Sequence, residues 1–220
     1  MATYKKYTIR YVDGFKIRNT LDDDFGVIGR YSTAIAHFSP KYYIPPNEIW
    51  IDAPFHQELD FFLTSEFYTD EHPEFKKMSY HKVREHLKKE LCLAGPLPHF
   101  KKHLHSSDPE IILVDGKVVR AYLDPDFIFG GHEYVYDYVP KNEIWLDQFT
   151  DPQELPFIEH HEKIERNLMK AGATYDEAHD IASAEEKRLR RHRLGTAYPG
   201  DTHFPWYGLE NDELVRQFYV

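Results

Sequence analysis

Cysteine is nearly absent from this sequence. The single cysteine, Cys92, excludes an internal disulfide and any zinc site built from several thiolates. No apolar run approaches the roughly 20 residues that a membrane-spanning helix needs. The first residues, MATYKKYTIRYVDG, contain no apolar block of the kind found in a secretory signal peptide. We therefore expect a cytoplasmic protein without a membrane partner.

Positive charge is also scarce. The chain has 27 lysines and arginines against 37 aspartates and glutamates, a formal net charge of −10. This balance argues against broad binding to a nucleic-acid backbone. The basic run at residues 187–193 is typical of a solvated helix end, where cations favour the helix dipole. The sequence also has no P-loop, no GxGxxG and no GxSxG motif.

The composition is that of a globular protein. Of the 220 residues, 41% are apolar and 15% aromatic. That length suffices for one large domain or two small ones with a real core.

The chain repeats itself. YIPPNEIWID, from Tyr43, matches YVPKNEIWLD, from Tyr138, at seven of ten positions. VDGFKIRNTLDDDF, from Val12, likewise corresponds to VDGKVVRAYLDPDF, from Val114. Because the offset stays near 95 to 102 residues, we interpret the chain as a tandem duplication of one unit.

The sequence pattern of each repeat predicts a unit of the α+β class. The V-D-G turn between alternating apolar runs favours a β-hairpin. A third strand ends in NEIWID or NEIWLD, and a helical hairpin follows. We expect two pseudo-symmetric halves packed together, with Trp50 and Trp145 as core anchors.

Glycine and proline residues that break helices and strands divide the chain into four expected segments. Gly95, Pro96 and Pro98 mark a linker between the repeats. The C-terminal segment is rich in aromatic residues, so we expect it to pack on the body. The expected segments are a degenerate first repeat at 1–94, a linker at 95–109, a second repeat at 110–194 and an aromatic tail at 195–220.

The stretch HHEKIERNLMKAGATYDEAH, residues 160–179, carries the main candidate site. Gly172 is placed to close its first helix, and Thr174 with Glu177 forms a capping box for the second. His161 and Glu165 are four residues apart and share a helix face. Their face lies level with His179 if the helices are antiparallel, since Glu165 and His179 each stand roughly 7 to 8 Å from the turn.

This spacing predicts a metal centre. Two imidazoles and one carboxylate, His161, His179 and Glu165, are the ligand count of a catalytic zinc site with an open position. Glu162 falls where zinc peptidases keep a general base. Because a carboxylate replaces the second histidine of HExxH, manganese or iron would also suit the site.

Further residues could complete the site. Glu186, seven residues after His179, could be a ligand or could fix an imidazole. His132 could reach the site from the sheet, and Arg166 could orient a carboxylate or steady an oxyanion. Asp201 and His203 in the tail could close over a pocket.

A structural interpretation of the same residues is open. A histidine between helices is often only hydrogen-bonded, and Glu162 or Glu165 could pair with neighbouring lysine or arginine side chains. The first repeat has other residues at the positions that correspond to the His/Glu set, so the unit does not need this set to fold. Ser65, Glu66, Thr69 and Arg84 stand there in place of His161, Glu162, Glu165 and His179.

The second repeat resembles a family of small bacterial and phage proteins. The motifs are GGH, YxPxxEIWID, HExxERxLM and GxxYxxAHxxAxxxE, covering about residues 123–191. The resemblance implies a minimal metallopeptidase and points to His132, His161, Glu162, Glu165, Arg166, His179 and Glu186.

Two functions follow as hypotheses. The first is a metal-dependent hydrolase acting on a peptide or small molecule. The second is a non-enzymatic phage or prophage module that binds another phage or host protein, with a structural His/Glu cluster.

Overall fold

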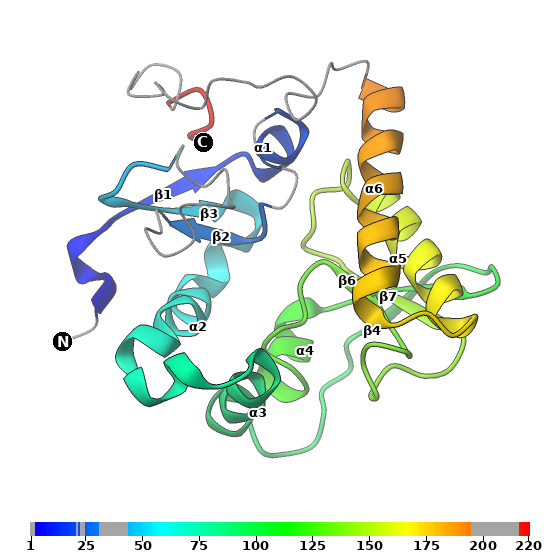
Figure 1. The fold of residues 1–220 in the computed structure, drawn as a ribbon, viewed down its shortest axis with the longest axis horizontal. Coiled ribbons are helices and arrows are strands. Elements are labelled where there is room, and N and C mark those ends of the chain that lie inside the picture. The colour runs from blue at the N-terminus through cyan, green and yellow to red at the C-terminus, as the bar shows by residue number, and fades with distance from the viewer. Residues whose placement is uncertain (1–2, 21, 23–24, 31–43, 195–215) are drawn as a thin grey trace. The chain divides into compact units, whose positions relative to one another are not determined.

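The computed structural model describes residues 3–20, 22, 25–30, 44–194 and 216–220 (Figure 1). The chain divides into two compact units, and both contain helices and a sheet. Unit 1 comprises Met1–Met78 and Thr196–Val220, and unit 2 comprises Ser79–Gly195. The expected α+β class is therefore confirmed.

Unit 1 is built on a three-stranded sheet of order β1-β3-β2. β1 runs parallel to β3, and β2 runs antiparallel to it. All five residues of β3 are buried, as expected of a strand covered on both faces. Its elements are η1 (Thr3–Lys6), β1 (Thr8–Val12), α1 (Gly14–Thr20), β2 (Ile28–Arg30), β3 (Glu48–Asp52), η3 (Ala53–Glu58), α2 (Leu59–Glu71) and η4 (Pro73–Lys77).

Unit 2 has a four-stranded sheet of order β4-β5-β7-β6. β5 and β7 are parallel, whereas β4 and β6 pair antiparallel at the two edges. Helix α5 packs on β6, β7 and α6. Its elements are α3 (Tyr80–Leu91), β4 (Lys101–His105), β5 (Glu110–Val114), α4 (Gly116–Tyr122), β6 (Gly130–His132), β7 (Glu143–Asp147), α5 (Leu155–Lys170) and α6 (Tyr175–Leu194).

The β-hairpin expected at V-D-G is wrong in both units. A helix begins there instead, because the aspartate acts as an N-cap: Asp115 accepts hydrogen bonds from the backbone N–H groups of Lys117 and Val118. Gly116 is required because a Cβ there would lie 1.9 Å from an oxygen of Asp147. Buried Arg120 in turn donates to Asp147.

The same arrangement occurs in unit 1. Arg18 donates to Asp52 at 2.9 Å, and both side chains are buried. A Cβ on Gly14 would lie 2.1 Å from an oxygen of Asp52. Each unit thus ties its short helix to the end of its central strand by an arginine–aspartate pair.

The two tryptophans are core residues, as expected. Trp50 and Trp145 are 0% and 1% exposed. Each indole donates to the glutamate two residues earlier, Glu48 or Glu143. Within the described end of the tail, Phe218 packs on Trp50 in unit 1.

The helical hairpin expected in the first repeat is absent from the described structure. After α2 the chain forms η4, and α3 belongs to unit 2. There Arg84 and Lys88 bind the buried carboxylate of Asp124, which supplies the attraction that places α3. The segment expected as a linker contains β4, so the compact units differ from the repeat boundaries, which stay a prediction about the sequence.

The helical hairpin of unit 2 is confirmed. Gly172 has φ +102° just after α5, and Thr174 begins α6 through its exchange of hydrogen bonds with Glu177. These are the capping signals that the sequence carries. In the part of the chain that the structure describes, no helix has the length and apolar character to cross a membrane.

Candidate metal centre

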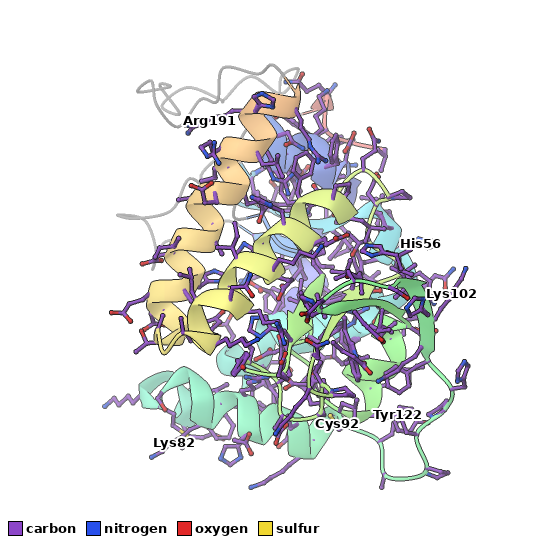
Figure 2. All side chains as sticks on the ribbon, turned by 90° about the vertical axis from the view of Figure 1, so that its right-hand side faces the viewer. His56, Lys82, Cys92, Lys102, Tyr122 and Arg191 are labelled. Carbon is purple, nitrogen blue, oxygen red and sulfur yellow. The ribbon has the colours of Figure 1, made fainter. Side chains whose placement is uncertain are left out.

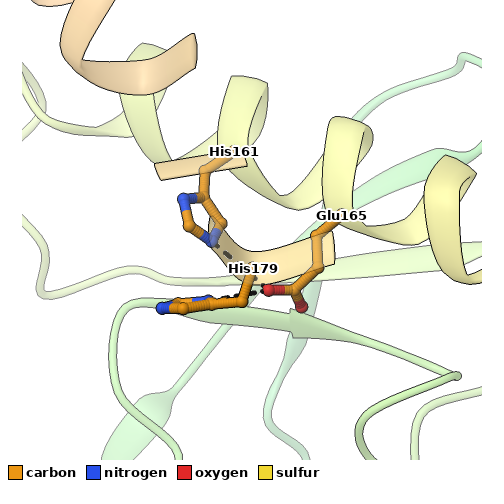
Figure 3. A group of neighbouring side chains, drawn as sticks. All are labelled: His161, Glu165 and His179. Carbon is orange, nitrogen blue, oxygen red and sulfur yellow. Dashed lines mark hydrogen bonds and ion pairs between the residues drawn. The ribbon is translucent and has the colours of Figure 1, made fainter. Parts of the chain in front are cut away.

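His161, Glu165 and His179 converge between α5 and α6 (Figure 3). One oxygen of Glu165, Oε2, lies 2.8 Å from Nδ1 of His179 and 3.5 Å from Nε2 of His161. The three ligand atoms lie within 4.8 Å of one another. A tetrahedral ion with ligands about 2.1 Å away separates them by roughly 3.4 Å, so these residues fit a divalent metal.

Glu186 fixes the orientation of His161. Nδ1 of His161 donates to Oε2 of Glu186 at 3.0 Å, which leaves Nε2 facing Glu165. Glu186 is itself bound by Arg190, and Arg190 also donates to buried Glu154. In this structure Glu186 accepts a hydrogen bond from the imidazole, the contact expected of a residue that fixes its orientation.

His132 reaches the same carboxylate from the sheet. It lies on β6, is fully buried, and places Nε2 3.2 Å from Oε1 of Glu165. Its Nδ1 accepts a 3.3 Å hydrogen bond from the backbone N–H of Tyr134. His132, Glu162 and Glu165 form a second group of ligand atoms within 4.8 Å.

Glu162 is a buried carboxylate at the cavity wall. It is 9% exposed, and none of the described residues donates a hydrogen bond to it. The absence of a side chain at Gly130 makes room for it, since a Cβ there would lie 3.2 Å from Cγ of Glu162. The first glycine of the Gly130-Gly131-His132 motif thus allows the side chain of Glu162 to lie close to the backbone of β6.

The two glutamates of the cluster have pKa values shifted in opposite directions. Burial raises the pKa of Glu162 to about 7, against the opposing charge of His161. Burial raises the pKa of Glu165, but close contacts with the imidazoles of His132, His161 and His179 hold it well below the usual range. A neutral-range pKa suits Glu162 to proton transfer, whereas Glu165 stays charged.

Without a metal, the pKa values of His161 and His179 are raised, which favours their charged forms. Burial opposes a charge on His161, yet its hydrogen bonds to Glu165 and Glu186 raise the pKa to about 10. The hydrogen bond to Glu165 also raises the pKa of His179. The cluster therefore favours positive charge at its centre.

A cavity of about 210 Å³ opens beside the cluster. Two tyrosines in its wall were not expected from the sequence. Tyr175 stacks on His179, with ring centroids 5.3 Å apart, and Tyr136 makes an edge contact with Phe127. The cavity is lined by Asp126, Ile128, Gly130, Gly131, Val135, Tyr136, His161, Glu162, Glu165, Tyr175 and His179.

A signal for Tyr175 was present in the sequence. It stands four residues before His179, so the two share a helix face. Tyr136 carried no such signal, because its place in the wall depends on the path of the chain after β6.

Arg166 does not line the cavity. Its guanidinium binds Glu133 at 2.7 and 2.9 Å and also donates to Asn142. The expected role in steadying an oxyanion is not supported by this placement.

The other candidates have structural surroundings. Asp124 accepts a hydrogen bond from the backbone N–H of Asp126, a contact typical of a turn. Cys92, labelled in Figure 2, follows α3 and is half-buried, and burial raises the pKa of its thiol. Asp201 and His203 lie outside the described residues.

Unit 1 holds an ion pair at the corresponding place. Arg30 has the strand position that His132 has in unit 2, since Arg30 pairs with Ile49 and His132 with Ile144. Arg30 binds Glu66 and Asp70, both at 2.8 Å. Among the described residues of unit 1, no group of three histidine, cysteine or acidic side chains is arranged to hold a metal.

No protein-family model, curated protein or solved structure matches this chain.

Proposed function

We propose that unit 2 is a metal-dependent hydrolase that cleaves a peptide or amide bond. His161, Glu165 and His179 would hold a divalent ion, zinc by preference, with manganese or iron as alternatives. The observation that carries the proposal is Glu162: a buried carboxylate, without a hydrogen-bond donor in the described chain, stands at the cavity wall beside these three ligands.

The metal would act as a Lewis acid that polarises the scissile carbonyl and makes water a better nucleophile at neutral pH. Glu162 supports the reaction by accepting the proton of the attacking water, for which a pKa of about 7 is suited. It can then return this proton to the leaving amine.

The remaining residues hold this constellation in place. Glu186 keeps Nδ1 of His161 as a donor, so that Nε2 faces the ion position. Tyr175 presents its ring to the cavity beside His179, where its phenol can donate to the substrate carbonyl. Arg166 has a supporting role through its pairing with Glu133.

We further propose that the two units arose by duplication of one ancestral unit, with the site confined to the second. The support is the shared arrangement of a parallel strand pair, an antiparallel edge strand and an arginine–aspartate pair in each unit. The ion pair of Arg30 with Glu66 and Asp70 stands where the second unit has its His/Glu cluster.

One observation favours a second candidate function, a non-enzymatic binding or assembly module. The charges of Glu165, His161, His179 and Glu186 form a connected ion-pair network that ties α5 to α6 when the imidazoles are protonated. Such a network can stabilise a helical hairpin without any catalysis.

The test is a hydrolase screen on the full chain loaded with zinc or manganese, using peptide and amide substrates. Glu162→Gln should abolish the activity found while leaving the ion at His161 and His179 and the fold in place. Glu159→Gln, on the same helix, is the matched control and should stay active. For the non-enzymatic module, Glu162→Gln is silent and His161→Ala lowers the melting temperature.

A further inference from the structure

We infer that Glu165 bridges two cation positions, and that His132 and Glu162 hold a second divalent ion. The inference rests on the proposed function, since the first ion at His161 and His179 shares the same carboxylate. It assigns a ligand role to a histidine of the sheet that the one-metal site leaves without a function.

The two oxygens of Glu165 face different partners. Oε1 lies 3.2 Å from Nε2 of His132, and Oε2 lies 2.8 Å from Nδ1 of His179. The ligand atoms of His132, Glu162 and Glu165 lie within 4.8 Å of one another, as a group separate from that of His161 and His179. A carboxylate oriented in this way can bind one ion through each oxygen, as in two-metal hydrolytic sites.

The buried imidazole of His132 has a nitrogen that is free to bind a metal ion. It is 0% exposed, and its Nε2 makes no hydrogen bond of regular geometry with the described residues although Oε1 of Glu165 is near. Buried polar atoms are seldom left in this state. Coordination through Nε2 puts the proton on Nδ1, so the long contact from the Tyr134 N–H must give way.

Glu162 supplies the second argument. It is nine-tenths buried, and no described lysine or arginine contacts either Glu162 or Glu165. Arg166, the next residue after Glu165, is held by Glu133 instead. The imidazoles of His161 and His179 face Glu165, and a divalent ion between Glu162 and Glu165 would offset the second buried carboxylate.

Unit 1 shows a positive charge at the equivalent place. Arg30, which has the strand position of His132, donates to the carboxylates of Glu66 and Asp70 on α2. Unit 2 has His132 in place of this arginine, and a metal ion bound there would supply the positive charge.

The ligand chemistry indicates the class of ion. One imidazole and two carboxylates form a harder set than the two imidazoles and one carboxylate of the first position. Manganese or iron suits it at least as well as zinc. Glu162 has two oxygens, so one can face this ion while the other faces the cavity.

The experiment is a metal titration of the full, untagged, metal-free chain with Mn²⁺ and with Zn²⁺, with bound equivalents measured by calorimetry and elemental mass spectrometry. We expect two equivalents for the wild type and one for both Glu162→Gln and His132→Gln. His160→Ala, next to the site on α5, is the matched control and should keep two. Paramagnetic resonance of the Mn²⁺ form should show exchange coupling between two ions.

The outcomes separate the two proposals. One equivalent in the wild type, unchanged in Glu162→Gln, overturns the second position and leaves the hydrolase site standing. No bound metal overturns both. If His132→Gln melts below the assay temperature, the isosteric Glu162→Gln decides the question alone, and an uncoupled Mn²⁺ signal at two equivalents would contradict a shared Glu165.

Discussion

The imidazole of His161 is held from behind by Glu186. Nδ1 donates to Oε2 of Glu186 at 3.0 Å, and the opposite nitrogen, Nε2, points to Glu165 at 3.5 Å. A histidine ligand with a carboxylate on its other nitrogen has a fixed tautomer and a fixed ring plane. This relationship distinguishes the cluster from a surface ion pair, and it leads to the first prediction.

Glu186→Gln should weaken metal binding about 10- to 100-fold, because a neutral amide no longer supports the imidazole as a carboxylate does. Calorimetric titration with Zn²⁺ measures the change. Glu185→Gln, a neighbour that pairs with exposed Arg188, is the matched control. Equal metal affinities in the two variants would show that Glu186 does not support His161 as a ligand.

Metal binding should release protons at neutral pH. In the metal-free protein His161 has a pKa of about 10 and is largely protonated at pH 7, and the hydrogen bond to Glu165 also raises the pKa of His179. A metal must displace these protons, and its affinity should therefore fall as the pH is lowered. Titrations in buffers of different ionisation enthalpy give the number released, and a value near zero would contradict the assignment.

The metal-free protein should also become less stable as the pH rises above neutral. A raised pKa on His161 contributes stability that is complete below about 6.5 and is lost as the pH approaches 10. The raised pKa of Glu162 acts in the same direction at lower pH, because the contribution of this buried acid is lost as the pH rises from about 4.5 to about 7. Melting temperatures from pH 6 to 10 should decline, and the metal-loaded protein should decline less.

Tyr175→Phe should reduce turnover and leave the bound metal unchanged. The variant keeps the ring that stacks on His179 and removes only the hydroxyl of this cavity-lining residue. Loss of one donor to a developing oxyanion costs about 100- to 1,000-fold in kcat. Unchanged kcat with an active wild type would assign Tyr175 to packing alone.

Arg120→Met should destabilise unit 2 by about 3–5 kcal/mol, because it leaves Asp147 buried without its cation. Arg188→Met, which breaks an exposed pair with Glu185, should cost about 0–1 kcal/mol. Urea unfolding of both variants measures the difference. Similar losses would mean that the buried pair does not hold α4 to β7.

The site was more predictable from the sequence than the fold around it. The helical hairpin is specified locally: Thr174 and Glu177 cap α6, and the counts from the turn set Glu165 level with His179. These signals act within one or two turns of helix. That is why His161, Glu165 and His179 could be brought together from spacing alone.

The V-D-G segments show why the rest could not be predicted. Their local pattern suits a hairpin turn as well as a helix N-cap, and the choice depends on distant residues. Asp147, 31 positions after Gly116, lies against this glycine at the start of α4 and binds Arg120. Similarly, α3 lies in unit 2 because of Asp124, a partner 40 positions from Arg84.

Bound metal in the untagged protein tests the central claim most directly. Elemental mass spectrometry should find at least one equivalent of a divalent transition metal. His161→Ala and His179→Ala should lose the ion held between α5 and α6, whereas His160→Ala should retain it. A wild-type protein that holds no metal, even after zinc or manganese is added back, would contradict the hydrolase and favour a structural His/Glu cluster.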